Sequence, residues 1–146
     1  MLFRSYTGVP AKWIQYIYEN YGIYTMLNHS FGRYGLTLDG VWVPVTKYSE
    51  PRTQEFLLSE VDKLVNDYKN TPGLLLYLLG NENNYGLFWA GAETEDFPDD
   101  DAEKAYIGET RGRPMYKLMN EAAKKIKASD SSHPVAICNE IGRAHV

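Results

Sequence analysis

The segment that most constrains the fold is an unbroken apolar run from Leu74 to Leu79, which ends abruptly at Gly80. Four polar residues follow, in the order Asn-Glu-Asn-Asn from 81 to 84. A short run without polar residues predicts a parallel strand buried on both faces, and the glycine with its polar neighbours marks the carboxyl end of that strand. Parallel α/β folds carry their chemistry at this end of the strands, so residues 80–84 are the first candidate site.

The apolar run belongs to a repeated order of helical stretch, Gly or Pro stop and short strand. The spacing predicts a helix from Pro10 to a stop at Gly22, a second from Glu50-Pro51 until Asn70, Pro72 and Gly73 break it, and a third from about Pro114. A strand follows each helix, at Ile23–Leu27, Leu74–Leu79 and Val135–Cys138. The residues expected to face the core are Trp13, Ile14, Ile17 and Tyr21, then Leu57, Val61, Leu64, Val65 and Tyr68, then Tyr116, Met119, Ala123 and Ile126. This alternation predicts βαβ units in a parallel sheet with the helices outside.

Composition limits the partners of the chain. It has 146 residues, of which 44% are hydrophobic and 23% are charged, and its net charge is -4 at pH 7. Such a chain has no basic patch for nucleic acid, and no run approaches the roughly 20 apolar residues of a membrane helix. Its single cysteine, Cys138, lies in a predicted strand and is expected to be a buried, inert thiol. Because metal-site spacing and phosphate-binding glycine loops are missing, we expect no metal and no cofactor.

The two ends of the chain differ in character from the middle. Residues 1–5 and 140–146 match translations of common short-read sequencing adapters, the first read from a GTG start and the second running into a TGA stop. Our hypothesis is that both ends are artefacts of a metagenomic reading frame and that the genuine piece is residues 6–139. On this hypothesis the chain starts without a first strand and stops inside its last one. We therefore give no functional role to Arg4, Glu140, Arg143 or His145.

Three phrases in the middle of the chain resemble a known family. They are YGIYTMLNH at Tyr21–His29, NTPGLLLYLLGNENNYG at Asn70–Gly86 and HPVAI at His133–Ile137. Together they resemble the catalytic domain of the clan A glycoside hydrolases, most closely that of family two and its relatives. The resemblance covers nearly all of residues 6–139. It implies a partial (β/α)8 TIM barrel, from the end of the second barrel strand to the fifth.

The resemblance assigns chemistry to the residues that follow the central strand. In the family an Asn-Glu pair closes the fourth barrel strand, and its glutamate is the general acid/base, which makes Glu82 the catalytic residue here. By the same resemblance, Asn81 hydrogen-bonds a substrate hydroxyl next to the scissile bond. The alternative is a simple turn, in which Asn81 adopts a left-handed conformation and Glu82 is solvated.

The second carboxylate of a retaining glycosidase has no candidate in this chain. In the family the nucleophile is a glutamate at the end of the seventh strand, whereas this chain stops near the fifth. A predicted solvated connection after the central strand holds the acidic residues Glu93, Glu95, Asp99, Asp100 and Asp101, to which we assign no catalytic role. We therefore expect the polypeptide to be inactive by itself.

Candidate sugar contacts lie near the same end of the strands. Asn28 and His29 follow the strand after the first helix and are expected to bind sugar hydroxyls, the alternative being a histidine satisfied by its own loop. Tyr85 and Trp89 come soon after Glu82 and are expected to form a stacking wall for a sugar ring. Packing beneath the acidic connection is the alternative for both aromatic residues.

The connection over residues 30–49 is long for a compact domain. It holds Arg33, Tyr34, Trp42 and Pro44 among several glycines. Long loops of this kind often act as functional lids, although ordinary loop packing explains the same residues.

The residues and the resemblance together indicate a fragment of a retaining glycoside hydrolase. The expected partner is an oligosaccharide or polysaccharide, whose O-glycosidic bonds the full-length parent cleaves without a cofactor. Two alternatives stay open, namely a carbohydrate-binding or degenerate barrel without catalysis, and a small α/β domain in which Glu82 only caps a turn. The sequence does not identify the sugar, the linkage, the compartment or the oligomeric state.

Overall fold

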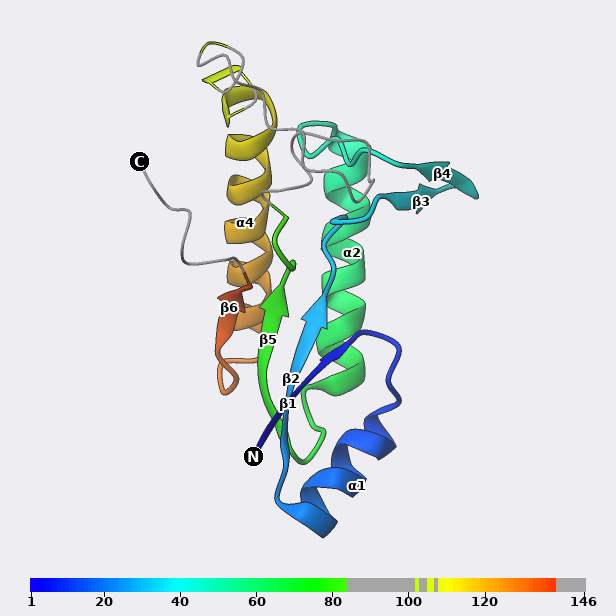
Figure 1. Cartoon of the computed structure of the whole chain (residues 1–146), viewed down its shortest axis with the longest axis vertical. Coiled ribbons are helices and arrows are strands. Elements are labelled where there is room, and N and C mark those ends of the chain that lie inside the picture. Colours follow the sequence, from blue (N-terminus) through cyan, green and yellow to red (C-terminus); the bar gives the residue numbers. More distant parts are fainter. Residues whose placement is uncertain (84–101, 103–104, 107, 139–146) are drawn as a thin grey trace.

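A parallel four-stranded sheet forms the centre of the molecule, shown in Figure 1. The computed structural model describes residues 1–83, 102, 105–106 and 108–138. The sheet order is β1 (Leu2–Tyr6), β2 (Tyr24–His29), β5 (Leu74–Leu79) and β6 (Val135–Ile137), with every neighbouring pair parallel. Strands that are neighbours in the sheet therefore follow one another along the chain, and the order never reverses.

Helices connect the strands, as the spacing predicts. They are α1 (Ala11–Tyr21), α2 (Pro51–Tyr68) and α4 (Arg113–Ser129), the last preceded by a short π-helical turn, η2 (Gly108–Gly112). Gly22 ends α1 in a left-handed conformation with φ 63°, and its N–H bonds back to the last turn of the helix. The predicted mixed α/β architecture with a parallel sheet is confirmed. None of the described helices is both long and apolar enough to cross a bilayer.

The described helices cover one face of the sheet. Ile14 of α1, Leu57 of α2 and Met119 of α4 belong to a single buried core. The sheet contributes Leu27, Tyr77 and Leu79 to this core, and these three residues lie on the same side because side chains alternate along a strand. Figure 1 shows α2 and α4 side by side behind the strands.

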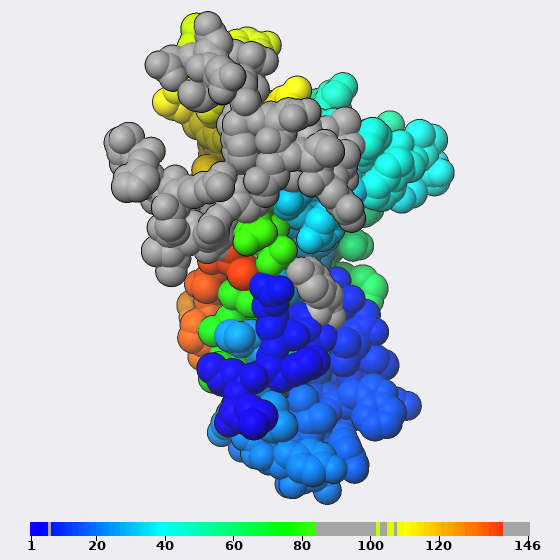
Figure 2. Space-filling view, viewed as in Figure 1, coloured from blue at the N-terminus to red at the C-terminus, as the bar shows by residue number. Residues whose placement is uncertain are grey.

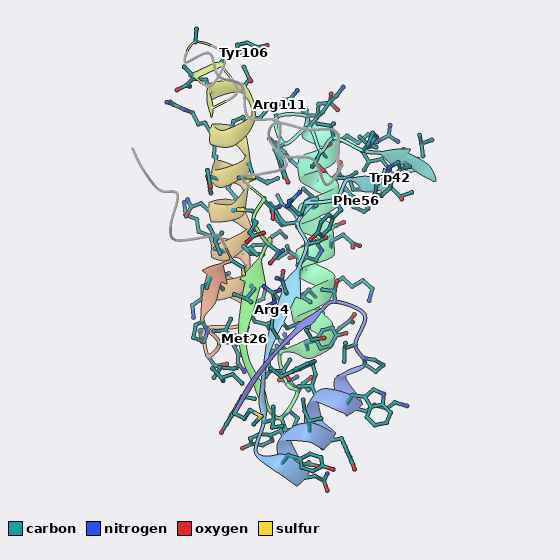
Figure 3. The ribbon with its side chains drawn as sticks, in the orientation of Figure 1. Arg4, Met26, Trp42, Phe56, Tyr106 and Arg111 are labelled. Atoms are coloured by element: carbon teal, nitrogen blue, oxygen red, sulfur yellow. The ribbon has the colours of Figure 1, made fainter. Side chains whose placement is uncertain are left out.

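The opposite face of the sheet carries the alternate residues, and we call it the open face. Arg4 of β1 pairs with Met26 of β2, and Asn28 pairs with Leu78 of β5. Figure 3 labels Arg4 and Met26. The buried side chain of Leu78 is not a member of the core beneath the helices. The two faces therefore differ, one packed by helices and the other lined by a mixture of polar and apolar side chains.

A buried polar cluster closes the other end of the sheet, where α4 leads into β6. The Asp130 carboxylate accepts hydrogen bonds from the Tyr77 hydroxyl (2.9 Å) and from the Ser132 hydroxyl (2.6 Å), and it pairs with the His133 ring (2.6 Å). Burial alone would raise the pKa of Asp130, but these hydrogen bonds outweigh burial and hold the pKa well below its usual value. The cluster fixes the turn that delivers the chain into β6.

Three aromatic residues predicted to face the core lie on the surface instead. The exposed fractions are 53% for Trp13, 65% for Tyr21 and 41% for Tyr116. In α1 only Ile14 is fully buried, because a narrow stripe of this helix faces the sheet. The rings of Trp13 and Tyr21 instead pack edge-on against Tyr16, with centroids 5.8 and 6.1 Å away. The inward positions predicted for α2 are confirmed, with Tyr68 only half-buried.

The expectation that the chain starts without a first strand is wrong. Leu2–Tyr6 pair with Tyr24–Asn28 and form the edge strand β1. The backbone of these residues satisfies one side of β2, which would otherwise be unpaired. The adapter origin of residues 1–5 and 140–146 stays a prediction, as do the domain limits drawn from it.

A small hairpin lies within the predicted 30–49 connection. Its strands β3 (Leu36–Leu38) and β4 (Val41–Val43) are antiparallel and joined by Asp39 and Gly40. Both turn residues have positive φ, at 48° and 78°. An Asp-Gly pair with two left-handed residues is a favoured two-residue hairpin turn, and its twist suits the strands. Figures 1 and 2 show the hairpin projecting from the body beyond the carboxyl end of β2.

Candidate functional site at the carboxyl end of β5

The turn after β5 is bonded to both neighbouring strands. The Gly80 N–H donates to the His29 carbonyl (2.8 Å), and the Glu82 N–H donates to the Cys138 carbonyl (2.7 Å). Glu82 has φ 54°, so the left-handed residue in this turn is Glu82 and not Asn81. A left-handed glutamate is strained, and such residues persist only where their surroundings hold them. The two backbone bonds supply part of that support.

The buried side chain of Asn83 holds this turn against the loop that follows β2. Its Oδ1 accepts the Asn81 N–H (2.7 Å), and its Nδ2 lies within hydrogen-bond distance of the carbonyls of Ser30 (3.1 Å) and Phe31 (2.9 Å) and of the Tyr48 hydroxyl (3.2 Å). Only 1% of Asn83 is exposed. We call this set of contacts the Asn83 clamp. It fixes the backbone on both sides of Glu82.

Two neighbours complete the Asn83 clamp. The Tyr48 hydroxyl donates to the Phe31 carbonyl (2.8 Å), and burial raises the pKa of Tyr48 to about 12, so the hydroxyl keeps its proton. Gly80 has φ 78°, and a Cβ added there would come within 2.4 Å of Asn83 Oδ1. Position 80 therefore requires glycine both for its backbone conformation and for the space that Asn83 occupies.

Arg4 reaches the same turn from the open face. Its Nη1 donates to Asn81 Oδ1 (2.8 Å) and to Cys138 Sγ (3.2 Å). Because an arginine side chain can only donate hydrogen bonds, the Asn81 atom that contacts Arg4 is the amide oxygen. The other branch of the amide is then the NH2 group, which is a donor. The turn therefore presents an amide donor at Asn81 beside the Glu82 carboxylate.

The Glu82 side chain is half-buried. In the part of the chain that the structure describes, no side chain donates a hydrogen bond to its carboxylate. A carboxylate and an amide donor next to each other at the carboxyl end of a parallel strand can exchange a proton with a ligand and hold one of its hydroxyl groups.

Asn28 lies on the open face but is wholly buried, with 0% exposure. Neither its Oδ1 nor its Nδ2 has a hydrogen-bond partner among the residues that the structure describes. A buried amide without partners is rare in folded proteins. A sugar hydroxyl can reach Asn28 only after neighbouring side chains move, so the sugar-binding role of this residue stays a prediction.

The His29 side chain lies on the helix side of the sheet, the same side as Leu27. Its Nδ1 accepts the Phe31 N–H (3.1 Å), and its Nε2 is 3.9 Å from a carboxylate oxygen of Glu60 on α2. Burial lowers the pKa of His29, although the Glu60 carboxylate acts in the opposite direction. His29 and Glu60 border a cavity of about 260 Å³ that also touches Thr7 and Asp67. The structure brings Asn81 and Glu82 together, and it places His29 in a different environment.

Several predicted residues lie outside the described part of the chain. These are the stacking candidates Tyr85 and Trp89 and the acidic residues Glu93, Glu95, Asp99, Asp100 and Asp101. Within the described residues, no three His, Cys, Asp or Glu side chains cluster closely enough to hold a metal ion.

The sequence reasoning did not anticipate the parts played by Asn83, Tyr48 and Arg4. Nothing in local spacing links Asn83 with Phe31, which is 52 positions away along the chain. Arg4 was set aside with the other residues of the chain ends. The available signal for Asn83 was its place next to the Asn-Glu pair, directly after a buried strand.

Comparison with known proteins adds no family to this description, because no family model matches the chain and no curated protein is significantly similar to it.

Proposed function

We propose that this chain carries the acid/base half of the active site of a retaining glycoside hydrolase with a (β/α)8 barrel. The observation that carries the proposal is the position of Asn81 and Glu82, at the carboxyl end of a parallel strand whose sheet follows chain order. A doubly wound sheet reverses its strand order and has helices on both faces. A barrel keeps the order and has all its helices outside. Among the residues that the structure describes, helices cover only one face of the sheet, which supports the barrel.

The edge of the sheet at β6 supports the same architecture. An apolar cavity of about 420 Å³ lies between α4 and β6, bordered by Met119, Val135 and Ile137. In a barrel, the helix of the next βα unit packs at this position. Ile137 remains 45% exposed on the core side of β6, which suits a residue that a further unit covers.

The roles of the two site residues follow from glycosidase chemistry. Glu82 protonates the leaving oxygen as the glycosidic bond breaks and then, as a carboxylate, deprotonates the water that attacks the covalent intermediate. Asn81 donates its amide hydrogen to a hydroxyl of the sugar next to that bond. The nucleophile is a glutamate about 5 Å from Glu82 in the complete barrel, by resemblance at the end of the seventh strand. The polypeptide alone does not turn over substrate.

Long reads across the source locus test the proposal first. The reading frame is expected to continue into further βα units, with a glutamate at the end of the seventh strand. A continuous frame without that glutamate favours a carbohydrate-binding barrel. Genuine genomic DNA at both ends, with a stop after Val146, contradicts the fragment hypothesis.

Kinetics of the extended parent then test Glu82 itself. Glu82→Gln is expected to lower the hydrolysis of unactivated glycosides by about 10²–10⁴-fold, the usual contribution of general acid catalysis. With a dinitrophenyl glycoside, Glu82→Gln should retain the rate of the first step, in which the glycosidic bond breaks, because that leaving group departs without protonation. The matched control is Glu60→Gln, a half-buried carboxylate on the helix side of the sheet. Equal rates for Glu82→Gln and the parent on unactivated substrates would show that Glu82 is not the acid.

A further inference from the structure

The β3–β4 hairpin presents a fixed aromatic surface to solvent. Trp42 of β4 is 57% exposed, yet its ring lies against the backbone of Gly35. A Cβ added at Gly35 would come within 2.7 Å of Trp42 Cζ2 and within 2.5 Å of the Val43 carbonyl oxygen. Gly35 also has φ 89°, so this position favours glycine for its backbone and leaves room for the indole. The ring is supported on one side and accessible on another.

The hairpin contacts α2 through its turn, and a hydrogen bond closes its base. Asp39 in the turn forms an ion pair with Arg52 in the first turn of α2. At the base, the Thr46 hydroxyl donates to the Gly32 carbonyl (2.7 Å) and joins the segments that precede and follow the hairpin. The loop between β2 and the hairpin is bonded to the Asn83 clamp, which also fixes the turn of Glu82. Figure 3 labels Trp42 on this hairpin, which follows the carboxyl end of β2, and the turn of Glu82 follows the carboxyl end of the neighbouring parallel strand β5.

The chemistry around the ring suits a neutral sugar. Pyranose rings have an apolar face of C–H groups that packs on aromatic rings and an edge of hydroxyl groups that needs polar neighbours. Thr37 pairs directly with Trp42 across the hairpin, and Tyr34 is 48% exposed at its base. The charge of Asp39 is balanced by Arg52, so the tip of the hairpin favours a neutral ligand over an ionic one.

Exposure alone does not distinguish Trp42, because Trp13 is 53% exposed. Trp13 lies in the first turn of α1, and its ring packs edge-on against Tyr16. The ammonium group of Lys12 lies 5.9 Å from the centroid of the Trp13 ring. Trp42 differs in its glycine support, its polar neighbours and its fixed link to the candidate site.

We propose that Trp42 is a stacking platform for a sugar ring of an extended, neutral polysaccharide, at a distance from the bond that is cleaved. The inference rests on the proposed function and deepens it. The substrate is then a polymer that reaches from Glu82 to the hairpin. Trp42 is a specificity-determining residue and takes no part in the chemical step.

Affinity electrophoresis of the 146-residue polypeptide tests the platform without any turnover. Native gels would contain hydroxyethyl cellulose, xylan, galactomannan or xyloglucan, and each protein would also be run without polymer. At least one polymer is expected to retard the wild type. Trp42→Ala should weaken that binding about three- to tenfold, as expected for the loss of one aromatic contact, and Trp42→Phe should restore part of it. Trp13→Ala should bind like the wild type. Thermal melting monitored by circular dichroism checks that each variant is folded.

The outcomes separate the platform from the catalytic assignment. Retardation that is the same in Trp42→Ala and Trp13→Ala would overturn the platform, as would a wild type that none of the four polymers retards. If polymer binding depends on Trp42 while Glu82→Gln leaves the parent fully active, the acid/base assignment fails and the platform stands.

Discussion

Replacing Asn83 with alanine should destabilise the protein by about 3 kcal/mol. The substitution removes the bonds from Asn83 to the Asn81 N–H and to the carbonyls of Ser30 and Phe31, together with the contact to the Tyr48 hydroxyl. A neutral hydrogen bond contributes about 0.5–1.5 kcal/mol net, and a buried group left without a partner costs about 1–3 kcal/mol.

Most of the groups that contact Asn83 keep another partner after the substitution. The Ser30 carbonyl still accepts the Arg33 N–H, and the Phe31 carbonyl still accepts the Tyr48 hydroxyl. Only the Asn81 N–H loses its one observed partner. Three net bonds at about 1 kcal/mol each therefore give the estimate, and water that enters the space left by the amide prevents a larger loss.

Urea unfolding followed by tryptophan fluorescence and far-ultraviolet circular dichroism measures the effect. With an m-value of about 2 kcal/mol/M, the midpoint should fall by about 1.5 M. Asn83→Asp keeps the shape but replaces a donor with a buried acceptor, so at neutral pH it should destabilise at least as much as alanine. Asn66→Ala on the exposed face of α2 is the matched control, with a change within about 0.5 kcal/mol. A loss below about 1 kcal/mol for Asn83→Ala would refute the clamp.

Two further predictions concern pH. The depressed pKa of Asp130 means that its stabilisation is present above the unfolded value of about 4 and is lost as pH falls through the folded value. Asp130→Asn should therefore be less stable at pH 7 and should lose stability less steeply between about pH 4 and pH 2, as acid titration by circular dichroism would show. The lowered pKa of His29 acts in the same sense over a higher pH range, because the unfolded chain binds the proton first as pH falls below about 6.5. The wild type should lose stability from pH 7.5 to 5.5 more steeply than His29→Gln, and parallel urea midpoints for the two proteins would contradict the assignment.

The sequence predicts the central βαβ unit closely because local signals there agree. Leu74–Leu79 is a strand in the structure with the predicted bounds, and α2 begins at the predicted Pro51. The continuous apolar run allows few assignments other than a buried strand. The helical spacing that ends in Asn, Pro and Gly allows few other than a helix that stops at these residues. The hairpin after β2 also had a local signal, the Asp39–Gly40 turn flanked by apolar residues, but the general expectation of a long loop obscured it.

Contacts between distant segments account for what the sequence did not predict. The exposure of Trp13 depends on how much of α1 meets the sheet, and a helical period does not specify this. The contact of Arg4 with Asn81 spans 77 positions and requires β1 to pair with β2 in one register. The site residues Asn81 and Glu82 were accessible to sequence reasoning because they adjoin a strand end, whereas their supporting side chains come from elsewhere.

Under the proposed function, the left-handed backbone of Glu82 sets the stability of the fold against the chemistry of the site at one residue. Glycine adopts φ 54° without strain, whereas a residue with a Cβ loses about 1 kcal/mol there. A protein selected for stability alone would therefore favour glycine at position 82, and every glutamate-containing version gives up part of its stability to place a carboxylate at the end of β5. At position 82 the effects of a mutation on stability and on function therefore differ in sign. Replacing Glu82 with glycine relieves the strain of the turn, but it also removes the carboxylate.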